Sequence, residues 1–162
     1  MIFIDMKLTI IIFLFLILIQ ASNKREINVD KAGDNWDYQV HEALDLIKKT
    51  DYNVYERINK VCNKITFWSG NYSTNEFTHN KGVIIISAND AKYKSINNIA
   101  AIIVHESQHL TYRQLKESPK LNEELECYLY EYNFLKKIYN VEPFLLLHCE
   151  EQIKKYSKIK NF

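Results

Sequence analysis

The sequence predicts an α+β protein that is mostly helical and carries a small antiparallel sheet. Three observations favour this class. Apolar residues recur at helical spacing over most of the chain, two short β-branched and aromatic runs interrupt that pattern near the middle, and the most apolar helical stretch follows the second run. A chain of 162 residues is long enough for one domain, and no internal repeat divides it.

Residues 1–21 are expected to be a signal peptide or an N-terminal membrane anchor. Leu8 to Ile19 is an almost unbroken apolar run, shorter than the roughly 20 residues of a membrane-spanning helix. Lys7 precedes this run, and Ala21 is the candidate residue before a cleavage site. The segment predicts export to the periplasm or the extracellular space, or a membrane tether with the domain outside. Residues 22–33 are polar and are expected to form a linker to a domain over 34–162.

The first half of this domain predicts two helices and then two strands. Asp34-Asn35-Trp36 can cap a helix that runs to about Lys49, and a second helical segment covers about Asp51 to Lys64. Ile65–Trp68 and Gly82–Ser87 are expected to be antiparallel strands joined by a long polar connection. A strand beside a cleft can hold an extended peptide by main-chain pairing. The segment from Val83 to Ile86 could also be only a buried core strand, and the two roles do not exclude each other.

The second half predicts three helices. Ser95 is a good N-cap for a helix from about Ile96 to Leu115, which Ser118-Pro119 separates from the next one. That helix is expected from about Lys120 to Tyr139, and Pro143 opens a last helix that reaches about Lys158.

His105, Glu106 and His109 form an HExxH motif within the expected helix from Ile96 to Leu115. Residues four apart on an α-helix return to nearly the same face, so the two imidazoles can converge on one Zn²⁺. Glu106 is then placed beside the metal, where a carboxylate can take a proton from a zinc-bound water and pass it to a leaving group. Because Ala100 to Val104 is apolar, the helix is expected to be buried, and a metal would satisfy its histidines. The motif predicts a zinc hydrolase, specifically a peptidase, with one zinc per chain.

A catalytic zinc normally takes a third protein ligand, and the acidic cluster Glu123-Glu124-Leu125-Glu126 follows on the next helix. Glu124 lies three residues after Leu121 and four before Tyr128, which both belong to the apolar face of that helix. Glu124 therefore points inward and is the expected third ligand. Cys127 is expected to be a small buried residue that lets this helix approach the HExxH helix closely.

An HExxH helix followed by a Glu-x-x-Ala-like segment, here Glu124-Leu125-Glu126-Cys127, resembles the gluzincins, zinc metallopeptidases with two His and one Glu as ligands. The resemblance covers about His105 to Glu131. It implies a zincin-like domain that acts on a peptide or protein substrate with Glu106 as general base. Cys127 departs from the usual Ala, and Tyr128 stands where an Asp or Asn often supports the first imidazole.

Further side chains are candidates for supporting roles. Asn122-Glu123 is similar to an Asn-Glu pair of thermolysin-like enzymes, which makes Glu123 the alternative third ligand. A donor to the oxyanion could come from Tyr112, Tyr128 or His79. Glu131, seven residues after the expected ligand and thus on the same helix face, could hydrogen-bond a ligand imidazole or serve only in helix packing.

Composition excludes some classes of function. The net charge is +1, with acidic and basic residues interspersed, so nucleic acid is not an expected partner. Three cysteines exclude a disulfide scaffold, although Cys62 and Cys149 could pair in an oxidising compartment. His148 has no motif around it and is expected to be structural. Nothing in the sequence indicates an oligomeric state.

Two other functions stay open. The first is a catalytically inactive, zinc-stabilised binding or inhibitory domain at the cell surface. The intact Glu106 argues against it, because a purely structural site has no use for that carboxylate. The second is a helical, membrane-tethered interaction protein without a metal, which the zinc content of the protein would distinguish.

Overall fold

The computed structural model describes residues 26–31, 35–78, 81–93, 95–115, 119 and 122–159. Within these ranges the protein is α+β, as expected, with five helices and one four-stranded sheet. The helices are α2 (Trp36–Thr50), α3 (Tyr52–Val61), α4 (Ile96–Leu115), α5 (Glu123–Leu135) and α6 (Pro143–Tyr156). The strands are β1 (Asn28–Val29), β2 (Cys62–Trp68), β3 (Thr74–Thr78) and β4 (Lys81–Ser87), and a 3-10 turn, η1 (Asp90–Tyr93), follows β4.

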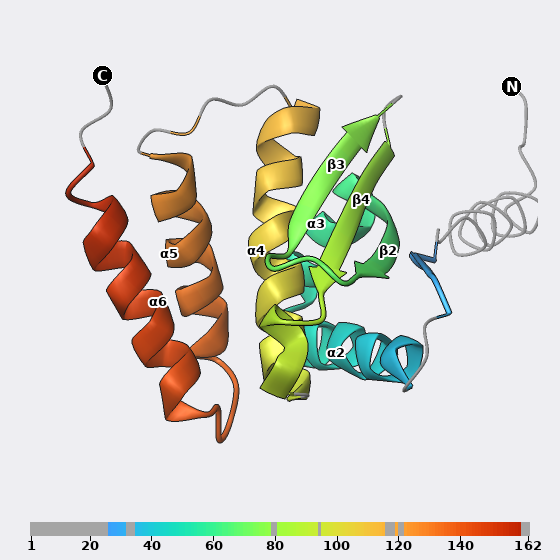
Figure 1. Cartoon of the computed structure of the whole chain (residues 1–162), viewed down its shortest axis with the longest axis horizontal. Coiled ribbons are helices and arrows are strands. Elements are labelled where there is room, and N and C mark those ends of the chain that lie inside the picture. The colour runs from blue at the N-terminus through green and yellow to red at the C-terminus, as the bar shows by residue number, and fades with distance from the viewer. Residues whose placement is uncertain are drawn as a thin grey trace, which may run out of the picture.

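Helix α4 is the centre of the molecule. In Figure 1 it stands between the sheet on one side and the α5–α6 pair on the other. It contacts α2, α3, α5, β3 and β4, whereas α6 packs mainly on α5. A helix surrounded in this way must be apolar on most sides, which explains why Ile99, Ile103 and Val104 are fully buried. The hydroxyl of Ser95 accepts a hydrogen bond from the main-chain N–H of Asn98, so Ser95 caps α4 as expected.

The sheet has the strand order β1-β2-β4-β3 and is mixed. β2 and β4 run parallel, with Ile65 opposite Ile84, so the expectation that these two segments pair antiparallel was wrong. The reason is a strand that was not expected. The chain reverses into β3 before β4 begins, and the antiparallel pair is therefore β3 with β4. β4 lies inside the sheet with neighbours on both sides, and β3 is an edge strand.

Several element boundaries differ from the expected ones. α3 ends at Val61 rather than near Lys64, because β2 already begins at Cys62. α5 covers Glu123–Leu135, a shorter span than 120–139. Within residues 22–33, expected to be a linker, Asn28–Val29 adds the parallel edge strand β1 to β2.

The cysteines do not form the suggested pair. Cys62, Cys127 and Cys149 are all free and buried. Burial raises the pKa of the Cys62 thiol to about 11. The thiol is therefore protonated at neutral pH and serves as a small core residue.

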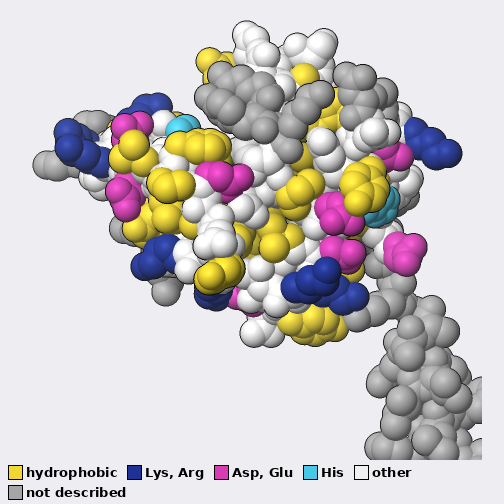
Figure 2. All heavy atoms as spheres, turned by 90° about the horizontal axis from the view of Figure 1, so that it is seen from below, with side chains coloured by type: hydrophobic (Ala, Val, Ile, Leu, Met, Phe, Trp, Pro, Cys, Tyr) yellow, Lys and Arg dark blue, Asp and Glu magenta, His cyan; other side chains and the backbone are white. Residues whose placement is uncertain are grey.

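The proposed signal peptide or anchor, residues 1–21, lies outside the described residues. Among the helices that are described, none is both long and apolar enough to span a membrane. Figure 2 shows acidic, basic and hydrophobic side chains interspersed on the face seen from below.

Candidate metal centre

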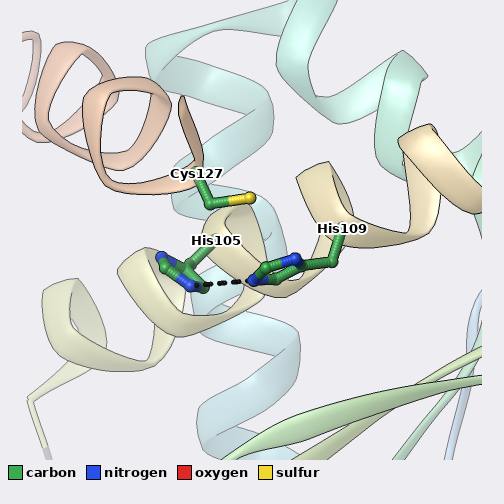
Figure 3. Close-up of side chains that lie close together, drawn as sticks. All are labelled: His105, His109 and Cys127. Atoms are coloured by element: carbon green, nitrogen blue, oxygen red, sulfur yellow. Dashed lines mark hydrogen bonds between the residues drawn. The ribbon is translucent and has the colours of Figure 1, made fainter. Parts of the chain in front are cut away.

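Two imidazoles meet on the buried face of α4. Nε2 of His105 and Nε2 of His109 lie 3.3 Å apart, as the dashed line in Figure 3 shows. Both residues are more than nine-tenths buried, with exposed fractions of 8% and 6%. The four-residue spacing on a regular helix is sufficient to produce this convergence.

Glu124 reaches the same point from α5. Its Oε2 lies 3.6 Å from Nε2 of His105, and its Oε1 lies 3.4 Å from Nε2 of His109. Ligands that surround zinc tetrahedrally at roughly 2.0–2.1 Å are separated from one another by about 3.3–3.4 Å. The two imidazoles have this spacing, and Glu124 places one carboxylate oxygen near each of them, so the three side chains offer donor types that suit a divalent metal such as zinc. Glu124 is partly exposed, so the centre opens toward solvent on its side.

Cys127 offers a second donor set. Its Sγ and one ring nitrogen of each histidine lie within 4.8 Å of one another. Figure 3 shows the side chain of Cys127 next to both imidazoles. Burial, reinforced by the negative charge of Glu124, raises the pKa of this thiol. Because the thiolate is the form that binds metals, a protonated Cys127 is a poorer ligand than Glu124 in the metal-free protein.

Each imidazole is held from its other side by a second carboxylate. Oε2 of Glu131 lies 3.0 Å from Nδ1 of His105, and Oε1 of Glu123 lies 2.6 Å from Nδ1 of His109. A carboxylate at Nδ1 favours the tautomer in which Nδ1 donates a proton and Nε2 presents its lone pair. Glu131 thus contacts the His105 imidazole, one of the two roles considered for it, and Glu123, the alternative ligand, contacts Nδ1 of His109.

These carboxylates also set the charge of His105. Burial lowers the pKa of this imidazole, but hydrogen bonds to Glu124 and Glu131 outweigh burial and raise the pKa to about 10. The interaction with His105 in turn lowers the pKa of Glu124. A proton thus occupies the cluster in the metal-free protein at neutral pH, where a divalent cation could replace it.

Glu106 lines the same cleft as His105, His109 and Glu124 but is not one of the candidate metal ligands. It is 7% exposed, and its Oε2 accepts a hydrogen bond of 2.6 Å from Nδ2 of Asn75 on β3. Asn75 in turn accepts hydrogen bonds from the Arg113 guanidinium on α4. Neither Asn75 nor Arg113 was expected in the site. They carry no motif, and Asn75 is 31 residues away from Glu106 along the chain.

Most of these groups, though not Glu123 or Cys127, border a cleft of about 830 Å³. One wall consists of β3 and α4, the other of α5 and α6, and the lining includes His105, Glu106, His109 and Glu124. Phe144 and Leu147 of α6 add partly exposed apolar surface to the second wall. The cleft gives a ligand access to a centre whose histidines are otherwise enclosed.

The candidates for an oxyanion donor are found in different places. Tyr128 lines the cleft, and its ring centroid lies 4.4 Å from that of His105. Tyr112 is buried and its hydroxyl donates to Glu126, so it is already engaged. His79 lies outside the described residues. His148, expected to be structural, lies on the cleft wall in edge contact with Tyr128.

No family model matches this sequence, and no curated protein matches it at a significant level.

Proposed function

We propose that this chain is a zinc-dependent peptidase that hydrolyses peptide bonds with Glu106 as general base. The main support is the convergence of His105, His109 and Glu124 at spacings of 3.3, 3.4 and 3.6 Å, with a further buried carboxylate beside them. Three protein ligands leave the fourth position of a tetrahedral zinc for water or substrate, as in catalytic rather than structural sites. The HExxH and Glu-x-x-Ala-like resemblance to gluzincins supports the same activity.

Bound zinc would supply Lewis acidity, polarising the peptide carbonyl and making water acidic enough to lose a proton near neutral pH. The residues of the chain carry out the proton transfers. Glu106, placed beside the donors rather than among them, accepts the proton from the attacking water and then delivers it to the departing amine. Negative charge that develops on the carbonyl oxygen needs a donor, and Tyr128 or His148 could supply it from the cleft wall.

An extended polypeptide is the substrate that fits the cleft best. β3 is an edge strand, and its residues Thr74 and Asn75 line the cleft. An edge strand offers main-chain groups to a peptide, which β4 in the sheet interior cannot do, although the main-chain oxygen of Asn75 already accepts from Arg113. Phe144 and Leu147 on the opposite wall are 43% and 56% exposed and favour an apolar side chain near the cleaved bond.

The proposal is tested with the zinc-loaded protein, a library of unstructured peptides, and the Glu106→Gln variant as the matched control. The parent should cleave a subset of peptides, lose activity with a chelator and regain it with zinc. Glu106→Gln should keep its zinc and its melting temperature but lose hydrolysis by about 10²–10⁴-fold, the usual contribution of a general base. Equal activity of this variant, or a zinc-loaded parent that cleaves none of the peptides, would contradict the proposal.

One observation favours a second function, a zinc-stabilised binding domain without catalysis. If Cys127 joined His105, His109 and Glu124, four protein ligands would close the coordination sphere, which is typical of structural zinc. Cobalt substitution distinguishes the two functions, because a thiolate ligand adds a sulfur-to-cobalt charge-transfer band. The peptidase proposal predicts that this band is absent and that Cys127→Ala has the same spectrum as the parent.

A further inference from the structure

Asn75 is a polar residue at a position where a strand normally buries an apolar one. Its two neighbours on β3, Thr74 and Glu76, are exposed, whereas Asn75 is only 8% exposed. Side chains alternate between the two sides of a strand, so Asn75 faces inward, toward α4. A buried amide needs partners for both of its ends, and α4 supplies them.

The two partners of Asn75 lie on the same side of α4. Arg113 follows Glu106 by seven residues, about two helical turns, so both side chains are on one face. Asn75 bridges them: its Nδ2 donates to Oε2 of Glu106 at 2.6 Å, and its Oδ1 accepts from Nη1 of Arg113. Nη1 of Arg113 also donates to the main-chain oxygen of Asn75 at 3.3 Å.

The chemistry of these three groups permits only one orientation of the amide. A guanidinium has donors and no acceptor, so the end of Asn75 that faces Arg113 must be the oxygen. An ionised carboxylate has acceptors and no donor, so the end that faces Glu106 must be the NH₂ group. Arg113 therefore prevents the amide from flipping and keeps its NH₂ group directed at Glu106.

We propose that Asn75, locked by Arg113, is the positioning residue that fixes the carboxylate of Glu106 for proton transfer. This inference rests on the proposed peptidase function. Nδ2 of Asn75 donates to Oε2 of Glu106. In this proposal, Oε1 is the oxygen that accepts the proton of the reacting water. A carboxylate held at one oxygen by a buried, immobilised donor stays in a single rotamer, and such preorganisation is what a general base needs.

A purely structural role for Asn75 would be to attach β3 to α4 through Arg113, and Asn75→Asp separates the two roles. Asp has the same shape and keeps an acceptor for Arg113, so β3 stays attached. It replaces the NH₂ donor by an oxygen that repels Glu106. We expect kcat to fall about 10–100-fold, part of the contribution of a general base, with KM changed less than about twofold and one zinc retained.

Two further variants control this result. Asn133→Asp makes the same chemical change at an exposed position on α5 and should leave kcat and KM at the values of the parent. Arg113→Met leaves Asn75 in place but removes the group that fixes its orientation. It should lower kcat by less than Asn75→Asp does, and it provides the test if Asn75→Asp does not fold.

The second readout does not depend on catalysis. Crystal structures of the zinc-loaded parent and of Asn75→Asp would show the rotamer of Glu106. We expect one orientation in the parent, with Oε2 on Asn75, and a rotated or divided side chain in the variant. An unchanged Glu106 together with parental kcat in Asn75→Asp would overturn the inference and leave the peptidase proposal intact. If the parent cleaves no peptide, the peptidase proposal fails, and the Glu106 rotamers still decide whether Asn75 positions this carboxylate.

Discussion

Oε2 of Glu131 lies 3.0 Å from Nδ1 of His105, on the opposite side of the imidazole from Glu124. Glu131 and Glu124 are seven residues apart on α5, so one helix face contributes both carboxylates. Glu124 lies at Nε2 of His105, the nitrogen that would bind a metal, and Glu131 lies at Nδ1, the nitrogen that would not. The ring is thereby held in one orientation, with Nε2 as the nitrogen that would bind a metal.

Replacing Glu131 by Ala should weaken zinc binding. Nδ1 of His105 would lose its acceptor, so the ring would be less basic and less well oriented. The affinity for zinc should fall about 10–100-fold, the usual effect of removing a partner behind a metal ligand. A titration against a competing chelator measures it. Glu131→Gln keeps an acceptor oxygen and should therefore lose less of its affinity for zinc. An Ala variant that binds zinc as tightly as the parent would refute the role assigned to Glu131.

The two possible donor sets predict opposite results for Glu124→Ala and Cys127→Ala. If zinc is bound by His105, His109 and Glu124, the first variant loses most of its affinity, because one of three ligands is gone. Cys127→Ala should keep one zinc per chain. Native mass spectrometry of both variants after dialysis gives the zinc content. Loss of zinc from Cys127→Ala together with its retention by Glu124→Ala would show that the sulfur is the ligand.

The raised pKa of His105 predicts how the metal-free protein depends on pH. Its value of about 10 in the folded protein exceeds the ordinary 6.5, so protonation of His105 favours the folded state. This stabilisation is fully present below about pH 6.5 and is lost as the pH rises toward 10. The melting temperature of the metal-free protein should therefore fall over this range. His105→Gln should remove that slope, and the same slope in this variant would assign it to another group.

The same shift predicts the pH dependence of zinc binding. Zinc must displace the proton from His105, so its affinity should rise about tenfold per pH unit while that imidazole is protonated in the free protein. Zinc binding at pH 7.5 should release about one proton from this residue, which calorimetry in buffers of different ionisation enthalpy measures. No proton release would contradict the charge state assigned to His105.

Tyr112→Phe should have little effect on hydrolysis. The Tyr112 hydroxyl donates to Glu126 and is buried, so it is not available to the carbonyl oxygen of a substrate. We expect kcat within about twofold of the parent and a loss of about 1–2 kcal/mol of unfolding free energy, the usual contribution of such a hydrogen bond. Denaturant unfolding and peptide hydrolysis measure the two quantities. A large drop in kcat without a change in stability would return Tyr112 to the list of oxyanion donors.

The sequence predicts those parts of the fold that local periodicity determines. Helix α4 and its cap at Ser95 follow from apolar spacing and capping chemistry, and the helix face of Glu124 follows from its distance to Tyr128. The structure brings Glu124 to the two imidazoles accordingly. The binding of zinc by these residues stays a prediction.

The sheet could not be derived in the same way. β3 looks like part of a polar connection because the residue at its buried position is Asn75, whose partners Glu106 and Arg113 are far away in sequence. Without β3, the sequence predicts β2 and β4 as consecutive strands. Consecutive strands usually pair antiparallel, which is why the sequence predicts the wrong pairing here. Glu123 is the alternative third ligand in the sequence because Asn122-Glu123 is similar to a thermolysin-like pair, whereas in the structure its carboxylate lies at Nδ1 of His109.

The zinc content of the purified protein tests the central claim most directly. Elemental analysis and native mass spectrometry should find one zinc per chain in the parent and none in His109→Ala, measured under the same conditions. A parent that binds no zinc when the metal is in excess, or a His109→Ala variant that binds zinc as tightly as the parent, would show that these side chains do not form a metal centre.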